Sequence, residues 1–357
     1  MNIADFDYHL PPERIAQIPI EPRDSSRLFV IHRQTGQFEH RTFRDIGDYL
    51  QPGDLLVANQ SKVLPARLHG VKEGSGGQVE LLLLAVRGDR GPDCWEALVR
   101  PGRRLHEGQR VLIGDGTLVA HLLERAPGGE RIIRLEAAEG TVADAVDRLG
   151  SMPLPPYIHE RLADAGRYQT VYAREPGSAA APTAGLHFTP ELLAMLRDRG
   201  IDTVFVTLHI GLDTFRPIGV ESLEKHVMHS EEIDMDEATA DRINRTRAAG
   251  GRIIAVGTTA VRTLEAVAAL SAERQAAGEL VAGALVTPYR GRTSIFLRPG
   301  HQFRAVDAMI TNFHLPKSTL MVLVSAFAGR ELILRAYEEA VREQYRFYSF
   351  GDAMLML

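Results

Sequence analysis

Three segments of the chain place a histidine or several hydroxyl groups directly before a predicted helix. The first covers residues 182–189 and reads PTAGLHFT. Thr189 fits a helix N-cap, and Pro190 fits the first helical position. A helix N-terminus offers unpaired N–H groups and partial positive charge, so a polar or anionic substrate can be held beside His187. A structural interpretation also fits this segment, in which it only caps a helix and the histidine packs in the core.

The second segment, residues 251–265, reads as a buried strand, a tight Gly-Thr-Thr turn and a helix. In parallel α/β sheets, ligands bind at the carboxyl ends of strands. The hydroxyls of Thr258 and Thr259 at a helix N-terminus suit a ribose, a carboxylate or a phosphate. The glycine spacing matches neither a Walker loop nor a dinucleotide fingerprint. A threonine-capped helix without a ligand is the alternative.

The third segment, residues 311–320, follows a short predicted strand with an amide, an imidazole, an ammonium and hydroxyls. A core helix needs a cap, but it does not need Asn312, His314 and Lys317 beside that cap. The pattern therefore favours a binding or catalytic loop.

A fourth histidine-rich region ends one predicted strand at His209 and continues with His226, His229 and Glu231. These four residues can be interpreted as a metal site or as a polar cluster. The H-E-x-x-H spacing is missing and no thiols support a metal, so the polar cluster is favoured. Histidine and glutamate are the usual proton carriers, which leaves an acid–base role open for one of them.

Alternating strands and helices must position these segments. The pattern predicts strands at 26–31, 54–59, 202–208, 252–256 and 308–311, and helices at 238–249, 261–270, 319–328 and 331–344. This alternation is typical of an α/β layer architecture. If the sheet is parallel, the loops after its strands meet on one side.

Residues 66–137 have a different character. Strand-like runs at 66–71, 78–86, 94–99, 110–113, 118–123 and 131–135 are separated by glycine-rich turns. This spacing predicts a small closed β-barrel. The fold class is therefore α/β, with a larger layered domain (1–63 and 151–357) and an inserted small β-barrel domain (64–150).

Composition narrows the class of protein. A chain of 357 residues is long enough for two domains. Its 45% apolar and 24% charged residues are typical of a globular enzyme. No apolar run reaches membrane-spanning length, and the N-terminus does not resemble a secretory signal. The single cysteine, Cys94, excludes an intramolecular disulfide and a cysteine metal cluster, so we expect a cytoplasmic protein. The net charge of −5 does not indicate a nucleic-acid binder, although a local basic face is enough for one.

Several of these segments together resemble one family. The resemblance spans essentially the whole chain and rests on residues 59–68, 79–83, 168–173, 182–189, 257–265, 311–320 and 345–354. It is to the S-adenosylmethionine:tRNA ribosyltransferase-isomerase family of queuosine biosynthesis.

The resemblance implies an enzyme that transfers and isomerises the ribosyl group of S-adenosylmethionine. The implied acceptor is 7-aminomethyl-7-deazaguanine at the wobble position of tRNA with a GUN anticodon, and the products are epoxyqueuosine in tRNA, adenine and methionine. S-adenosylmethionine is then a co-substrate, with no other cofactor and no metal. A monomer without membrane contact is also implied. Two alternatives are a non-catalytic RNA-binding module and a transferase that uses S-adenosylmethionine on a small-molecule acceptor.

This chemistry assigns expected roles to the loops. The sulfonium acidifies the C5′ protons, adenine needs a proton donor as it leaves, and the attacking amine must be uncharged. Candidates for proton transfer are His187, His209, His229, Glu231 and His314. Candidates for substrate binding are Thr183, Gly185, Thr258, Thr259, Arg262, Asn312, Lys317 and Ser318.

A phosphate-contacting face on the barrel is a further expectation, with an ordinary solvated surface as its alternative. Its candidate residues are Arg67, Arg100, Arg103, Arg104 and Arg110. We also expect exposed aromatic residues, Tyr168 or Tyr172, to stack on an anticodon base.

Two positions depart from the family pattern. Gln60 stands where the family commonly has aspartate, and Asp213 stands where it usually has glycine.

Overall fold

A computed structural model of the protein describes residues 1–102, 105–126, 129–160, 162–211, 221–280 and 283–357. The chain divides into two compact units. The α/β unit comprises Met1–Ser61, Pro156–Glu175 and Pro182–Leu357, and the barrel unit comprises Lys62–Pro155 and Pro176–Ala181. The domain limits drawn from the sequence, at residues 63 and 150, stay predictions.

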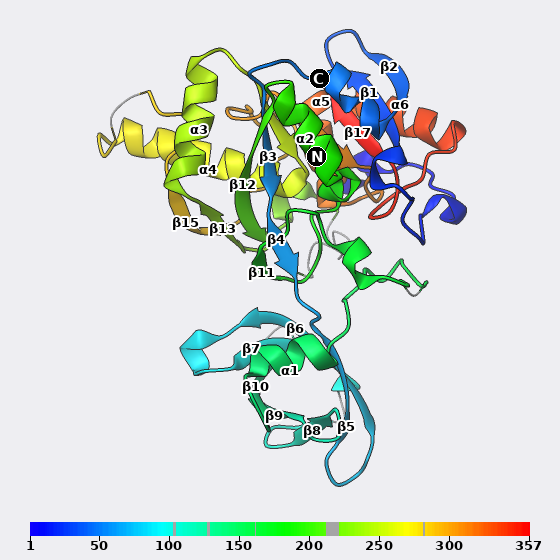
Figure 1. Ribbon diagram of the computed structural model, residues 1–357, viewed down its shortest axis with the longest axis vertical. Coiled ribbons are helices and arrows are strands. Elements are labelled where there is room, and N and C mark those ends of the chain that lie inside the picture. Colours follow the sequence, from blue (N-terminus) through cyan, green and yellow to red (C-terminus); the bar gives the residue numbers. More distant parts are fainter. Residues whose placement is uncertain (103–104, 127–128, 161, 212–220, 281–282) are drawn as a thin grey trace. The chain divides into compact units, whose positions relative to one another are not determined.

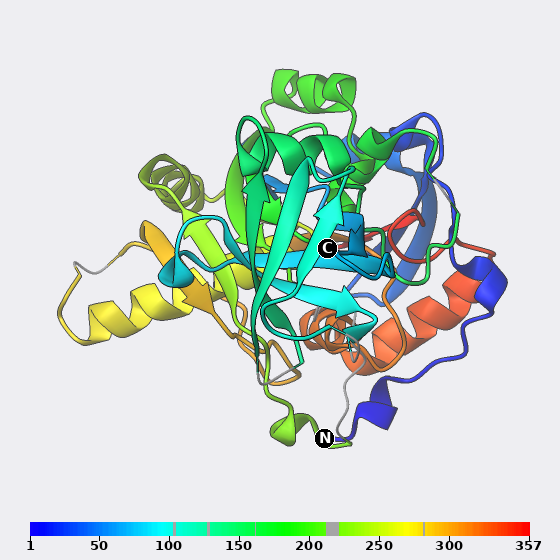
Figure 2. The ribbon, with the colours of Figure 1, turned by 90° about the horizontal axis from the view of Figure 1, so that it is seen from below.

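The barrel unit is a closed barrel of six antiparallel strands in the order β10-β7-β6-β5-β8-β9 (Figure 1 and Figure 2). The strands are β5 (Arg67–Lys72), β6 (Gln78–Val86), β7 (Cys94–Arg100), β8 (Arg110–Ile113), β9 (Leu118–Arg125) and β10 (Arg131–Ala137). Alternate residues such as Ala120 and Leu122 are buried, as expected for a barrel filled by side chains. Helix α1 (Val142–Leu149), capped by Thr141, packs on β9 and β10.

The α/β unit is built on a nine-stranded sheet in the order β15-β13-β12-β3-β14-β16-β17-β1-β2 (Figure 1). Its strands are β1 (Arg27–His32), β2 (Gln37–Thr42), β3 (Leu55–Asn59), β12 (Asp202–His209), β13 (Glu231–Met235), β14 (Ile253–Val256), β15 (Tyr289–Thr293), β16 (Ala308–Asn312) and β17 (Ala353–Met356). The four neighbours β12, β3, β14 and β16 are parallel. A separate two-stranded sheet pairs β4 (Ser61–Val63) with β11 (Glu175–Ser178).

Helices cover the sheet and fix the strand-end loops. They are α2 (Pro190–Asp198), α3 (Glu237–Ala248), α4 (Thr258–Ala276), α5 (Thr319–Ala328) and α6 (Arg330–Arg342). Helix α4 contacts β3 and β12 to β16, while α2 contacts β12. One core cluster joins the sheet residues Leu56 and Ile310 to Phe188 and to Leu192 of α2. Burial of this apolar surface is the main force that holds the loop before α2 against the sheet.

The predicted fold class is confirmed, since a layered α/β unit and a closed barrel are both present. Four strands of the sheet, β2, β13, β15 and β17, were not predicted. Strands β13 and β15, with the sequences EEIDM and YRGRT, lie antiparallel near one end of the sheet. One face of each strand is polar, so neither sequence contains the run of apolar residues by which a buried strand is recognised. Among the described residues, no helix is long and apolar enough to cross a membrane.

Candidate functional site

The loops after the parallel strands meet at one edge of the sheet, as predicted. The side chain of Asn312, at the end of β16, hydrogen-bonds His187 at 3.1 Å. At the end of β14, Gly257 has φ of 89° and serves as the N-cap of α4. A Cβ added there would lie 3.5 Å from Ala184, so the loop that carries His187 packs directly on the Gly-Thr-Thr turn.

His187 is buried and has both ring nitrogens engaged. Nδ1 lies 2.7 Å from the Ser26 hydroxyl, and Nε2 accepts a hydrogen bond from Asn312 Nδ2. Its ring stacks on Phe43 with centroids 5.0 Å apart. Burial, with the positive charge of Arg23, lowers the pKa of His187 to about 3. His187 is therefore a neutral histidine that ties Ser26, the residue before β1, to Asn312 at the end of β16.

His314 has a similar environment. Its Nε2 lies 3.0 Å from the Thr311 hydroxyl, and burial lowers its pKa to about 3. Nearby, Lys317 pairs with Asp7 at 2.7 Å. Ser318 caps α5 by accepting from Met321 N–H, and its hydroxyl donates to a backbone carbonyl. The predicted contacts of these residues with substrate stay predictions.

A buried ionic cluster lies at the start of α4. Arg262 and Glu231 are 5% and 3% exposed, and Arg262 Nη1 pairs with a carboxylate oxygen of Glu231. The other carboxylate oxygen lies 3.1 Å from His229 Nε2 and accepts from the N–H of Gly211 at 3.4 Å. Burial alone would raise the pKa of Glu231, but the hydrogen bond with His229 and the charge of Arg262 hold it below the ordinary range.

Several hydrogen-bond donors of this cluster are unused. Arg262 Nε and Nη2 and the hydroxyl of Thr259 are buried and have no hydrogen-bond partner in the described part of the chain. Helix α4 starts at Thr258 without a side-chain cap, so its first N–H groups are also available. Buried donors without acceptors are costly, and together with the helix dipole they favour an anion.

His209 lies at the end of β12, the strand next to β3. Its Nδ1 is buried without a hydrogen-bond partner among the described residues. Burial lowers its pKa, so the ring is neutral near pH 7 and can accept a proton. Gln60, the position that departs from the family pattern, donates to the hydroxyl of Thr207 at 3.4 Å, close to this histidine.

Gly185 and Thr183 belong to a 3-10 helix before α2. A Cβ added at Gly185 would lie 2.1 Å from the hydroxyl of Tyr172, so the glycine is required by close packing. The expectation that Tyr168 or Tyr172 is exposed for stacking is wrong. Tyr168 is fully buried against Phe350, and Tyr172 is buried in the core cluster, because neighbouring apolar surface covers both rings.

The candidate phosphate-binding arginines of the barrel differ in their surroundings. Arg100 is exposed, whereas Arg67 is half-buried beside Glu80 at 3.7 Å. Arg110 pairs with Glu73 at 3.0 Å. Arg103, Arg104 and Asp213 lie outside the described residues.

Two partners of the site were not found by sequence reasoning. Ser26 hydrogen-bonds His187, and Arg23 donates to the carbonyl of Leu186 in the loop before α2 and to the carbonyls of Gly166 and Gln169. Two serines before a strand, Ser25 and Ser26, are too common a pattern to indicate a functional site.

In the described part of the chain, no group of three or more His, Cys, Asp or Glu is arranged to hold a metal ion.

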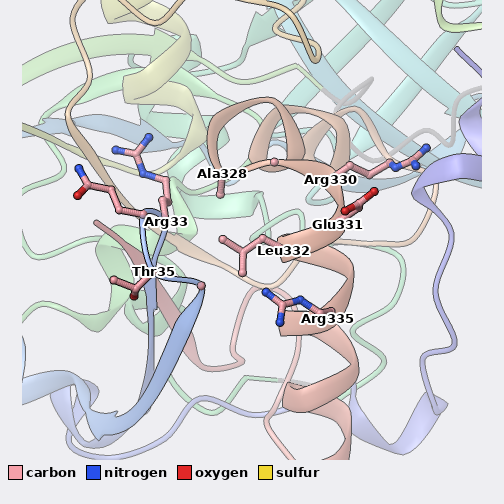
Figure 3. Close-up of a pocket in the computed structure, with 10 residues that line it drawn as sticks. Arg33, Thr35, Ala328, Arg330, Glu331, Leu332 and Arg335 are labelled. Carbon is pink, nitrogen blue, oxygen red and sulfur yellow. The ribbon is translucent and has the colours of Figure 1, made fainter.

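A cavity of about 630 Å³ lies at the opposite edge of the sheet, between the β1–β2 turn and α6 (Figure 3). Its cations are already engaged: Arg33 donates to three backbone carbonyls, and Arg330 lies 3.8 Å from Asp5. Arg335 stacks near Phe38. We therefore place the candidate site at the strand-end loops.

Comparisons with known proteins cover the whole chain. The model of a family described as queuosine biosynthesis protein matches residues 3–356. The chain is 56% identical over 357 residues to the S-adenosylmethionine:tRNA ribosyltransferase-isomerase of Moorella thermoacetica and 54% identical to that of Desulfitobacterium hafniense, with all of each chain covered. A crystal structure of S-adenosylmethionine tRNA ribosyltransferase from Thermotoga maritima is similar at a TM-score of 0.54 and 39% identity, covering 99% of this chain and 100% of that one.

Proposed function

The chain belongs to the queuosine biosynthesis protein family, and we propose that its acceptor is 7-aminomethyl-7-deazaguanine at the wobble position of tRNA with a GUN anticodon. The activity is that of an S-adenosylmethionine:tRNA ribosyltransferase-isomerase, the name of relatives 52–56% identical over the full chain. We propose epoxyqueuosine in tRNA, adenine and methionine as products. A cytoplasmic monomer that needs no metal or resident cofactor is part of this proposal.

The main structural support for this proposal is a set of hydrogen-bond donors at the start of α4 without acceptors in the described structure. Arg262 Nε and Nη2 and the Thr259 hydroxyl have no partner among the described residues, although they are buried. The methionine end of S-adenosylmethionine carries a carboxylate, which is the acceptor that a guanidinium fork binds best. We assign Arg262, Thr259 and the first N–H groups of α4 to that carboxylate.

Proton transfer is assigned to the groups that can change charge. Glu231 is an ionised, buried carboxylate next to His229, so this pair can accept the C5′ proton that the sulfonium acidifies. The neutral His209 can take a proton from the incoming amine. His187 keeps its place in the proposal as a neutral group that orients the loop before α2 through its bonds to Ser26 and Asn312. His314, also neutral, can orient its loop or donate a hydrogen bond to the departing adenine.

The direct test is an incubation of the protein with S-adenosylmethionine and an anticodon stem-loop that carries 7-aminomethyl-7-deazaguanine. We expect released adenine together with a matching mass gain on the RNA. Adenine without a mass gain would point to a small-molecule acceptor. A folded sample that gives neither product would favour an RNA-binding module and contradict the proposal.

A further inference from the structure

A polar cavity of about 360 Å³ lies over three neighbouring strands, β12, β13 and β15. We call it the β12–β15 cavity. Its volume is within the range of small-molecule sites. Its polar lining residues are Glu175, Thr207, His209, Glu232, Asp234, Arg290 and Arg292.

The register of the strands arranges these residues in two rows on one face. Thr207 pairs with Asp234, which pairs with Arg290. His209 lies opposite Glu232 in the next row. Across three strands, the order in each row is therefore a neutral acceptor, a carboxylate and a guanidinium. His209 and Asp234 are diagonal neighbours on this face, within reach of one ligand.

The ion pairs of the cavity are exposed to solvent. Arg290 lies 3.7 Å from Asp234, and its side chain is 88% exposed. Arg292 lies 3.4 Å from Glu232 with both side chains exposed, and it also donates to the hydroxyl and the carbonyl of Ser230, which hold it in place. Exposed pairs at these distances stabilise a protein by only about 0–1 kcal/mol, so a ligand can replace the partner of Arg290 at little cost, while Arg292 is already positioned by Ser230.

The three kinds of group match three parts of a guanine-type nucleotide. The Watson–Crick edge of a 7-deazaguanine presents N–H donors side by side, and an ionised carboxylate offers only acceptors. Guanidinium groups bind phosphate. The aminomethyl substituent lies on the far side of the base from that edge, and an imidazole nitrogen can accept a hydrogen bond from it. His209 Nδ1 is buried and has no partner in the described chain, so it is available to that amine.

We infer that the β12–β15 cavity binds the RNA nucleotide that is modified, with Asp234 holding the donor edge of its base and Arg290 and Arg292 holding the adjacent phosphates. His209 faces the aminomethyl group. This inference rests on the proposed function for the identity of the base. It adds a binding site and a specificity-determining residue, Asp234, to that function.

Equilibrium binding without S-adenosylmethionine tests the inference, because it requires no turnover. The probes are two anticodon stem-loops, one with 7-aminomethyl-7-deazaguanine and one with adenosine at the wobble position. Wild-type protein should prefer the first. Asp234→Asn should weaken binding of the deazaguanine RNA about tenfold and leave binding of the adenosine RNA unchanged. Asp241→Asn, an exposed carboxylate on α3, is the matched control and should behave like wild type.

Arg290→Ala provides a second variant that leaves the core intact. It should weaken both RNAs equally and reduce the slope of log affinity against log salt by about 1. The inference is overturned if Asp234→Asn keeps the wild-type preference, if wild type shows no preference, or if Arg290→Ala leaves the salt slope unchanged. If wild-type protein releases adenine and Asp234→Asn still prefers the deazaguanine RNA, this binding site is refuted and the proposed function is not. If Asp234→Asn loses the preference but wild-type protein releases no adenine, the binding site is supported and the proposed function is contradicted.

Discussion

Substitution of Arg262 by methionine should separate the structural role of the α4 cluster from its role in binding. Arg262 and Glu231 are both almost fully buried, so Arg262→Met leaves a carboxylate buried without its cation. Breaking a buried ion pair from one side costs about 3–5 kcal/mol of unfolding free energy. Replacing both partners, in Arg262→Met/Glu231→Met, should recover part of that loss, because two apolar side chains carry no desolvation penalty, although Gly211 N–H and His229 then lose their acceptor.

Binding of S-adenosylmethionine should follow a different pattern. A hydrogen bond to a charged group contributes about 1.5–3 kcal/mol, and about 1.4 kcal/mol is a factor of ten in affinity. Loss of the guanidinium should therefore raise the Kd for S-adenosylmethionine about tenfold or more. The double variant should bind as weakly as Arg262→Met, although it is more stable.

Urea unfolding and isothermal titration calorimetry measure the two quantities on the same samples. Arg274→Met is the matched control, because Arg274 lies in the last turn of the same helix in an exposed pair with Glu279 at 3.4 Å. It should change stability by less than about 1 kcal/mol and leave affinity unchanged. Wild-type affinity in the double variant would refute the carboxylate assignment. Unchanged stability in Arg262→Met would refute the reasoning from the buried pair.

The two buried histidines predict a loss of stability in mild acid. His187 and His314 have folded-state pKa values of about 3 against an ordinary 6.5, so below pH 6.5 the unfolded chain binds more protons. Urea unfolding should show a loss of about 2 kcal/mol per histidine from pH 7 to pH 5, and a flat profile would contradict this. Gly185→Ala should destabilise the protein by about 1–3 kcal/mol through overpacking, whereas thermal unfolding of Gly102→Ala, in open space, should match wild type; equal melting temperatures for the two would contradict the packing argument. Ser318→Ala should cost about 1 kcal/mol as a lost helix cap and leave the KM for S-adenosylmethionine unchanged; a raised KM would instead place its hydroxyl on substrate.

Local chemistry made much of the fold predictable from the sequence. Thr189 and Ser318 cap their helices as their positions before an apolar run indicate, because a cap needs only a hydroxyl and the next three residues. The barrel strands were also predictable, because glycine turns and the alternation of apolar and polar residues are local patterns that span only a few residues. The convergence of the strand-end loops followed from the parallel direction of the central strands.

The sequence by itself thus determined the caps, the barrel strands, the α/β alternation and the residue types that the site uses. Only the tertiary structure decided which of them are partners. Arg262 meets Glu231 across 31 positions, and His187 meets Ser26 across 161. The burial of Tyr168 was likewise decided by distant apolar residues. The physical reason is that burial and ion pairing depend on distances between segments, which the register of the assembled sheet sets and no local pattern encodes.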